Sequence, residues 1–182
     1  MSNILLYVSG SISCYKACNL ISLLTKDGHD VKVIASKNAL KFVGKASFEG
    51  LTKNKLYTNM FDSSEPIAHI TLPQKWADLI IAYPASADSI NKLASGIADN
   101  LFGAVCLANN YKKPLLIAPA MNNMMFEHPS VQESLKKLEK WGTKILPCEE
   151  GRLACGTNGK GRLLDPEKAY QYIQTILEKE NI

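Results

Sequence analysis

The chain has 182 residues, of which 46% are hydrophobic and 21% charged, enough to bury a sizeable core without disulfide bonds. Its formal net charge is only +4 and no run of basic residues occurs, which argues against nucleic acid as a partner. No apolar stretch approaches the length of a membrane span, the N-terminus lacks a signal-peptide pattern, and five cysteines form no regular framework. We therefore expect a reduced, cytoplasmic protein with no membrane partner.

Short apolar runs alternate with amphipathic stretches along the chain. The apolar runs predict strands at residues 3–8, 31–35, 78–83, 114–118 and 144–146. Helices are predicted at 13–26, 86–94, 100–107 and 130–141, and from Asp165 to the C-terminus. Strands that are apolar throughout and alternate with helices indicate a parallel sheet covered on both faces. We expect one domain over residues 1–182, a three-layer α/β/α Rossmann-like (flavodoxin-like) fold.

In such a sheet, ligands bind at the carboxyl ends of the strands. Gly10, Ser11 and Ile12 follow the first strand and lead into a helix, where free N–H groups and hydroxyls favour an anion; an ordinary serine-capped turn is the alternative. The dinucleotide fingerprint is absent, and Ser36 and Lys37 follow the second strand where an acid would hold a ribose. The pattern therefore favours a mononucleotide phosphate over NAD.

Two further loops follow buried strands. The third strand ends in PASADS, whose small residues and hydroxyls suit close approach of a ligand; its Ser86, Ala87, Asp88 and Ser89 are candidate contacts. The fourth ends in PAMNNMMF, with Ala120, Asn122 and Met125 as candidates. Methionine adapts to flat, polarizable partners but also fills gaps in cores, so both interpretations of the second loop stay open.

His69 and Cys155 are the candidates for chemistry. His69 lies among apolar residues, where a histidine is commonly a core residue, although its near-neutral pKa suits proton transfer. Cys155 lies in GRLACGTNGKGRLL, where glycines make it accessible and basic neighbours favour the thiolate. Cys14 and Cys18 have no partner at ligand spacing, so no metal site is predicted.

Taken together, these motifs resemble those of the flavin-dependent cysteine decarboxylases. PASADS resembles the PASANT motif of that family, and PAMNNMMF resembles PxMNxxMW. GRLACGTNGKGRLLDP is similar to the ACGxxGxGRM loop of the branch that acts on 4'-phosphopantothenoylcysteine, and SGSISCYK resembles the first flavin-phosphate loop. His69 falls where the family has its active-site histidine. The departures include Asp88 for asparagine and Ser89 for threonine, and a carboxylate cannot donate the hydrogen bonds of an amide.

The resemblance implies FMN as cofactor and decarboxylation of 4'-phosphopantothenoylcysteine to 4'-phosphopantetheine, in coenzyme A biosynthesis, through thioaldehyde and enethiol intermediates. It implies that His69 acts in the first half-reaction and Cys155 donates a proton in the second, from a loop at about 148–164 that closes over the substrate. Asn122 and Met125 would hold the substrate carboxylate. The implied cofactor contacts are Gly10, Ser11, Ile12, Ser36, Ser86, Ala87, Asp88, Ser89 and Ala120.

The resemblance also implies a homotrimer or a dodecamer with FMN at the subunit interface, and a stand-alone form without a ligase domain. A peptidyl-cysteine decarboxylase of the lantibiotic type is the nearest alternative, and Cys155 argues against it, because an enethiol product needs no second half-reaction. A non-catalytic flavin-binding regulatory subunit that binds a phosphatase is a second alternative. A flavin prenyltransferase is a third, which PAMNNMMF and the cysteine loop do not fit.

Overall fold

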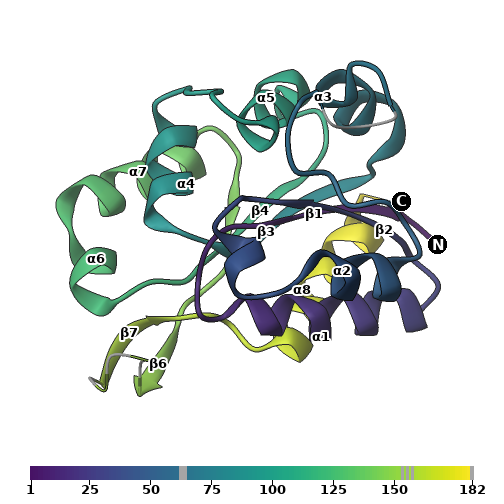
Figure 1. The fold of residues 1–182 in the computed structure, drawn as a ribbon. Coiled ribbons are helices and arrows are strands. Elements are labelled where there is room, and N and C mark those ends of the chain that lie inside the picture. The colour runs from purple at the N-terminus through teal and green to yellow at the C-terminus, as the bar shows by residue number, and fades with distance from the viewer. Residues whose placement is uncertain (62–64, 153, 155, 157, 181–182) are drawn as a thin grey trace.

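The structure, a computed structural model, describes residues 1–61, 65–152, 154, 156 and 158–180. Five parallel strands form one sheet in the order β2-β1-β3-β4-β5, which confirms the predicted parallel sheet (Figure 1). Each strand lies close to its predicted run. The bounds are β1 Asn3–Val8, β2 Asp30–Ala35, β3 Leu79–Ala85, β4 Leu115–Pro119 and β5 Lys144–Ile145.

Helices cover both faces of this sheet. Figure 1 shows α1, α2 and α8 on one side and α3, α4, α5 and α7 on the other. Five of the helices match predicted ones: α1 Cys14–Lys26, α4 Ala87–Ala94, α5 Leu101–Asn109, α7 Pro129–Lys140 and α8 Pro166–Lys179. The sequence analysis did not predict η1 Ala39–Lys41, α2 Lys45–Thr52, α3 Ala68–Thr71, η2 Leu72–Trp76 and α6 Asn123–Glu127. No helix among the described residues is long and apolar enough to cross a membrane.

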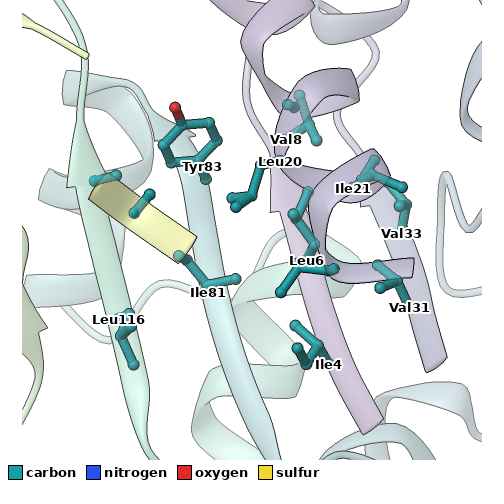
Figure 2. Packing of buried hydrophobic residues seen from close by; sticks show 14 of the residues in the cluster. Ile4, Leu6, Val8, Leu20, Ile21, Val31, Val33, Ile81, Tyr83 and Leu116 are labelled. Carbon is teal, nitrogen blue, oxygen red and sulfur yellow. The ribbon is translucent and has the colours of Figure 1, made fainter. Parts of the chain in front are cut away.

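The interior strand β1, between β2 and β3, is buried on both faces, which explains its continuous apolar sequence. Alternate side chains point to opposite sides of the sheet. Leu6 and Val8 pack in the cluster that includes Leu20 of α1, as Figure 2 shows. Leu5 and Tyr7 belong to the cluster on the other face.

The order of the strands positions a ligand site. The strand β1 lies between β2 and β3, so the chain moves to one side of β1 after the first helix and to the other side later. In open α/β sheets a ligand binds in the crevice outside the carboxyl ends at such a switch point. The relevant loops are those that follow β1, β3 and β4.

The segment expected to be a glycine-rich loop contains two paired strands. The antiparallel strands β6 (Glu149–Arg152) and β7 (Asn158–Arg162) form a hairpin that lies beyond the carboxyl ends of the main sheet (Figure 1). Cys155 lies between the two strands and outside the described residues. Polar, glycine-rich strands escaped prediction because their pairing satisfies the backbone without burying a face.

Buried polar contacts anchor the chain where it leaves the hairpin. The Tyr83 hydroxyl donates to the carbonyl of Leu164 at 2.6 Å inside the core. Lys16, which is buried in α1, forms an ion pair with Asp165 and donates to the carbonyl of Leu163. The hairpin therefore extends from a base that is fixed to α1 and β3.

Candidate active site

A cavity of about 590 Å³ lies at the carboxyl ends of β1, β3 and β4 and is bounded by the hairpin. Its size is in the range of small-molecule sites. We call it the cleft. The predicted site residues that line it are Gly10, Ser11, Ile12, Ser86, Ala87, Ala120, Asn122 and Met125.

A larger hollow of about 860 Å³ lies between the hairpin and α8, but it contains none of the predicted site residues. Its charged groups pair with one another: Glu149 accepts from Lys168 at 2.8 Å and lies 3.8 Å from Arg162. The position of the cleft at the switch point makes it the better candidate, despite its smaller volume.

The loop after β1 approaches other backbone closely. The buried Ser9 hydroxyl donates to the carbonyl of Pro84 and accepts from the N–H of Ser86, both at 2.8 Å, which ties the ends of β1 and β3 together. At Gly10, an added Cβ would lie 2.5 Å from the Cβ of Asn38. The Ser13 side chain makes no capping bond at the start of α1, but the Ser11 hydroxyl accepts from the N–H of Ser13 at 3.2 Å, so a serine-capped turn does form here.

Gly10→Ala is expected to lower the free energy of unfolding by about 1–3 kcal/mol, because one of two packed loops at the cleft must move. Urea denaturation would measure the loss. Gly50→Ala is the matched control: Gly50 lies within α2, where an added Cβ meets no atom within 4 Å, and alanine favours a helix. An unfolding midpoint for Gly10→Ala at or above that of the parent chain would contradict this account of the loop.

The loop after β3 divides its predicted residues between the cleft and the interior. Ser86 begins α4 as its N-cap and lines the cleft, while Ser89 is buried behind it with the two hydroxyl oxygens 3.2 Å apart. Ser36 also does not line the cleft, and its hydroxyl accepts from the N–H of Ala39. The Asp88 side chain is 70% exposed and pairs with Lys92 at 3.4 Å. The carboxylate that replaces the motif asparagine is therefore directed into solvent.

The loop after β4 carries the two predicted substrate contacts. Asn122 is the N-cap of the short α6, and its Oδ1 accepts from the N–H of Met124 at 2.9 Å, which fixes the carboxamide at the rim of the cleft. Met125 is 50% exposed, so it is not the core-filling methionine of the alternative interpretation. Ala120 is buried in the wall.

The hairpin packs directly against this loop. The N–H of Met121 donates to the carbonyl of Gly161 at 2.9 Å. Gly161 has a φ of +119°, and an added Cβ would lie within contact distance of the Met121 carbonyl oxygen. Arg152, Ala154 and Arg162 of the hairpin line the cleft, and the two arginines bring positive charge to its outer wall, although Arg162 also lies 3.8 Å from Glu149 and from Asp165.

His69 does not lie in the cleft of its own chain. It is partly buried in α3, which packs against α5, and Figure 1 shows α3 on the opposite side of the molecule from the hairpin. Glu65 holds this helix in place by accepting from the hydroxyls of Thr71 and Tyr57 at 2.5 and 2.7 Å. Within one chain, His69 and Asn122 therefore belong to different surfaces.

Lys16 and Tyr7 are among the residues next to the cleft that sequence reasoning missed. Lys16 lines it from the first turns of α1, and the lysine of SGSISCYK was the available signal. Tyr7 lies behind the cleft, and the one hydroxyl in the apolar run NILLYV could have indicated it. A single lysine or tyrosine forms no pattern in the sequence, so its position beside the cleft could not be predicted.

The fold and the cleft define an α/β protein with a small-molecule site at the switch point of a parallel sheet. The family model described as Flavoprotein matches residues 1–178. The chain belongs to the flavoprotein family.

Three known proteins are similar over nearly the whole chain. The coenzyme A biosynthesis bifunctional protein CoaBC of Bacillus subtilis is 46% identical over 180 residues, which cover 98% of this chain but 44% of that protein. A solved structure of a cysteine-to-serine variant of PPC decarboxylase, complexed with pantothenoylaminoethenethiol, has a TM-score of 0.88 at 32% identity and covers 97% of this chain and 98% of that one. The FMN binding protein AtHal3 has a TM-score of 0.85 at 32% identity, covering 98% and 97%.

Proposed function

We propose that the chain catalyses the FMN-dependent decarboxylation of 4'-phosphopantothenoylcysteine to 4'-phosphopantetheine, in the cytoplasm. The observation that carries the proposal is the cleft, which combines the loops after β1, β3 and β4 with a basic hairpin on either side of Cys155. Similarity to a coenzyme A biosynthesis protein and to a PPC decarboxylase supports the same reaction. Cys14, Cys18, Cys106 and Cys148 are free thiols, as suits a reducing compartment.

The residues of the cleft fit a phosphorylated flat ring. Ser11, Ser13 and Ser86 offer hydroxyl donors at helix N-termini, which favour an anion. Small residues at Gly10, Ala87 and Ala120 allow a ring to approach the backbone. Bound in the cleft, FMN would supply a two-electron acceptor for the thiol-bearing carbon of the substrate and, once reduced, a two-electron donor for the second half-reaction.

Different residues of the chain bind the substrate and transfer protons in the proposed reaction. Asn122 and Met125 hold the substrate carboxylate, whose loss the oxidised carbon permits. His69 serves as the acid–base group of the first half-reaction, and Cys155 gives a proton to carbon in the second. Arg152 and Arg162 bind the substrate phosphate, and the hairpin covers the bound substrate and excludes water.

The location of His69 favours an assembly in which subunits share the site. Because α3 lies away from the cleft of its own chain, His69 must be supplied to a cleft by a second copy for the proposed roles to hold. A homotrimer, or a dodecamer of such trimers, with FMN between subunits meets this need. Equilibrium sedimentation of the FMN-loaded protein would show a trimer or a multiple of one; a monomer would contradict the shared site.

Substrate preference tests the proposed reaction against the peptide alternative. The FMN-loaded protein would be incubated separately with 4'-phosphopantothenoylcysteine, its unphosphorylated form and a peptide that ends in cysteine. We expect consumption of the phosphorylated compound at least about tenfold faster than of either other, because Arg152 and Arg162 face the cleft. Faster consumption of the peptide would replace the proposal with a peptidyl-cysteine decarboxylase.

A further inference from the structure

A buried tyrosine lies behind the wall of the cleft that carries Ser86. Tyr7 is 5% exposed in β1, and its ring stacks on Phe102 of α5 with the centroids 3.9 Å apart and the planes at 4°. The stack accounts for the ring but not for the hydroxyl. A buried hydroxyl is costly without a hydrogen-bond partner, so the location of the phenol oxygen needs an explanation.

The phenol begins a chain of hydroxyl groups that ends at the cleft. The Tyr7 oxygen lies 3.3 Å from Oγ of Ser89, and Ser89 Oγ lies 3.2 Å from Oγ of Ser86. Of these three residues, Ser86 lines the cleft. Burial raises the pKa of the Tyr7 phenol, and side-chain hydrogen bonding with Ser89 and Ser36 acts in the opposite direction. Ser89, which was expected to contact the cofactor, therefore lies between Tyr7 and Ser86.

The acidity of the phenol gives the hydroxyl chain a direction. A phenol is a stronger donor than an aliphatic hydroxyl, which favours the order in which Tyr7 donates to Ser89 and Ser89 donates to Ser86. Ser86 Oγ also accepts from the N–H of Ser89 at 3.4 Å, which occupies both of its lone pairs. The hydrogen of the Ser86 hydroxyl must then point outward, into the cleft. Ser9 holds the N–H of Ser86 at 2.8 Å and keeps the residue from turning.

We infer that Tyr7 is a positioning residue that directs the hydroxyl hydrogen of Ser86 at a phosphate oxygen of the bound mononucleotide. The inference rests on the proposed function, in which that mononucleotide is FMN. Phosphate is the acceptor because Ser86 begins α4, whose N-terminal N–H groups favour an anion, and because the serine loop after β1 borders the same cleft.

Tyr7→Phe tests the inference, because it keeps the ring stacked on Phe102 and removes only the hydroxyl. We expect the dissociation constant for FMN, measured by quenching of flavin fluorescence, to rise about 3- to 10-fold, because the Ser86 hydroxyl remains and its hydrogen bond to the phosphate is weakened rather than lost. The dissociation constant for riboflavin, which lacks the phosphate, should change less than about twofold. The double variant Tyr7→Phe/Ser89→Ala should bind FMN no more weakly than Ser89→Ala alone, because both act through the Ser86 hydroxyl.

Tyr170→Phe is the matched control, since it removes a phenol hydroxyl from α8, outside the cleft; it should bind FMN within about twofold of the parent chain. Equal losses of FMN and riboflavin affinity in Tyr7→Phe would show a merely structural role for Tyr7 and overturn the inference. A double variant whose loss of FMN affinity equals the product of the losses in the two single variants would also overturn it. Unchanged FMN affinity would overturn it while leaving the proposed function intact. A parent chain that binds no FMN would overturn both.

Discussion

Cys155→Ser is expected to release carbon dioxide from 4'-phosphopantothenoylcysteine but to accumulate a product two hydrogens lighter than 4'-phosphopantetheine. The reason is that the first half-reaction needs no thiol from the protein, whereas the enethiol must receive a proton at carbon. A serine hydroxyl is far less acidic than a thiol and cannot supply that proton at neutral pH. Mass spectrometry of the product, together with capture of the released carbon dioxide, would measure both halves separately.

Cys148→Ser is the matched control for this variant. Cys148 lies just before the hairpin and outside the cleft, and its thiol contacts the carbonyl of Pro119 at 3.5 Å. Burial raises the pKa of this thiol to about 12, so it is neither a ready proton donor nor a nucleophile. Full turnover in Cys148→Ser beside a stalled Cys155→Ser would assign the proton to Cys155. Normal turnover by Cys155→Ser would remove Cys155 from the mechanism.

His69→Asn is expected to lower the rate of carbon dioxide release by about 10²- to 10⁴-fold, the usual effect of removing a general acid–base group. FMN binding should persist, because the hydroxyl donors and small residues that line the cleft are untouched. A single-turnover measurement with FMN-loaded protein would separate the loss of chemistry from a loss of cofactor. If the rate of carbon dioxide release stays within about twofold of that of the parent, His69 is an ordinary structural histidine and has no role in the chemistry.

A mixture of two inactive variants tests whether subunits share the site. His69→Asn and Asn122→Ala would be unfolded together and refolded with FMN, and each would be treated alone as the control. If one subunit supplies His69 and the next supplies Asn122, hybrid assemblies contain sites with both residues intact and recover part of the activity. Recovery in the mixture but in neither control supports the shared site. Equal inactivity in all three samples would contradict it.

The sheet and the strand-end loops were predictable because each depends on a local signal. Apolar runs such as NILLYV predict a buried parallel strand by composition alone, and the fold then places the following residues at a common edge. That is why Gly10, Ser86 and Asn122, far apart in the sequence, were expected together and line one cleft. This prediction did not require knowledge of how the residues of neighbouring strands pair.

The features that escaped prediction depend on contacts between distant segments. The polar strands β6 and β7 pair with each other and are held by Gly161 against Met121, which no periodicity in the sequence reveals. Asp88 lies in the middle of a motif that was expected to bind a ligand, yet its pairing with Lys92 directs it away from the cleft. Ser89 was expected to contact the cofactor itself, but it lies behind Ser86 and reaches the phenol of Tyr7.

The mass of the product formed from 4'-phosphopantothenoylcysteine shows whether the chain carries out the whole proposed reaction. The purified, FMN-loaded protein would be incubated with this compound and the product weighed by mass spectrometry. We expect loss of carbon dioxide alone, because we propose that both half-reactions take place in one cleft. Loss of carbon dioxide together with two hydrogens would mean an enethiol product and no role for Cys155. An untouched substrate, with FMN confirmed in the protein, would contradict the proposed enzyme and favour a non-catalytic flavin-binding protein.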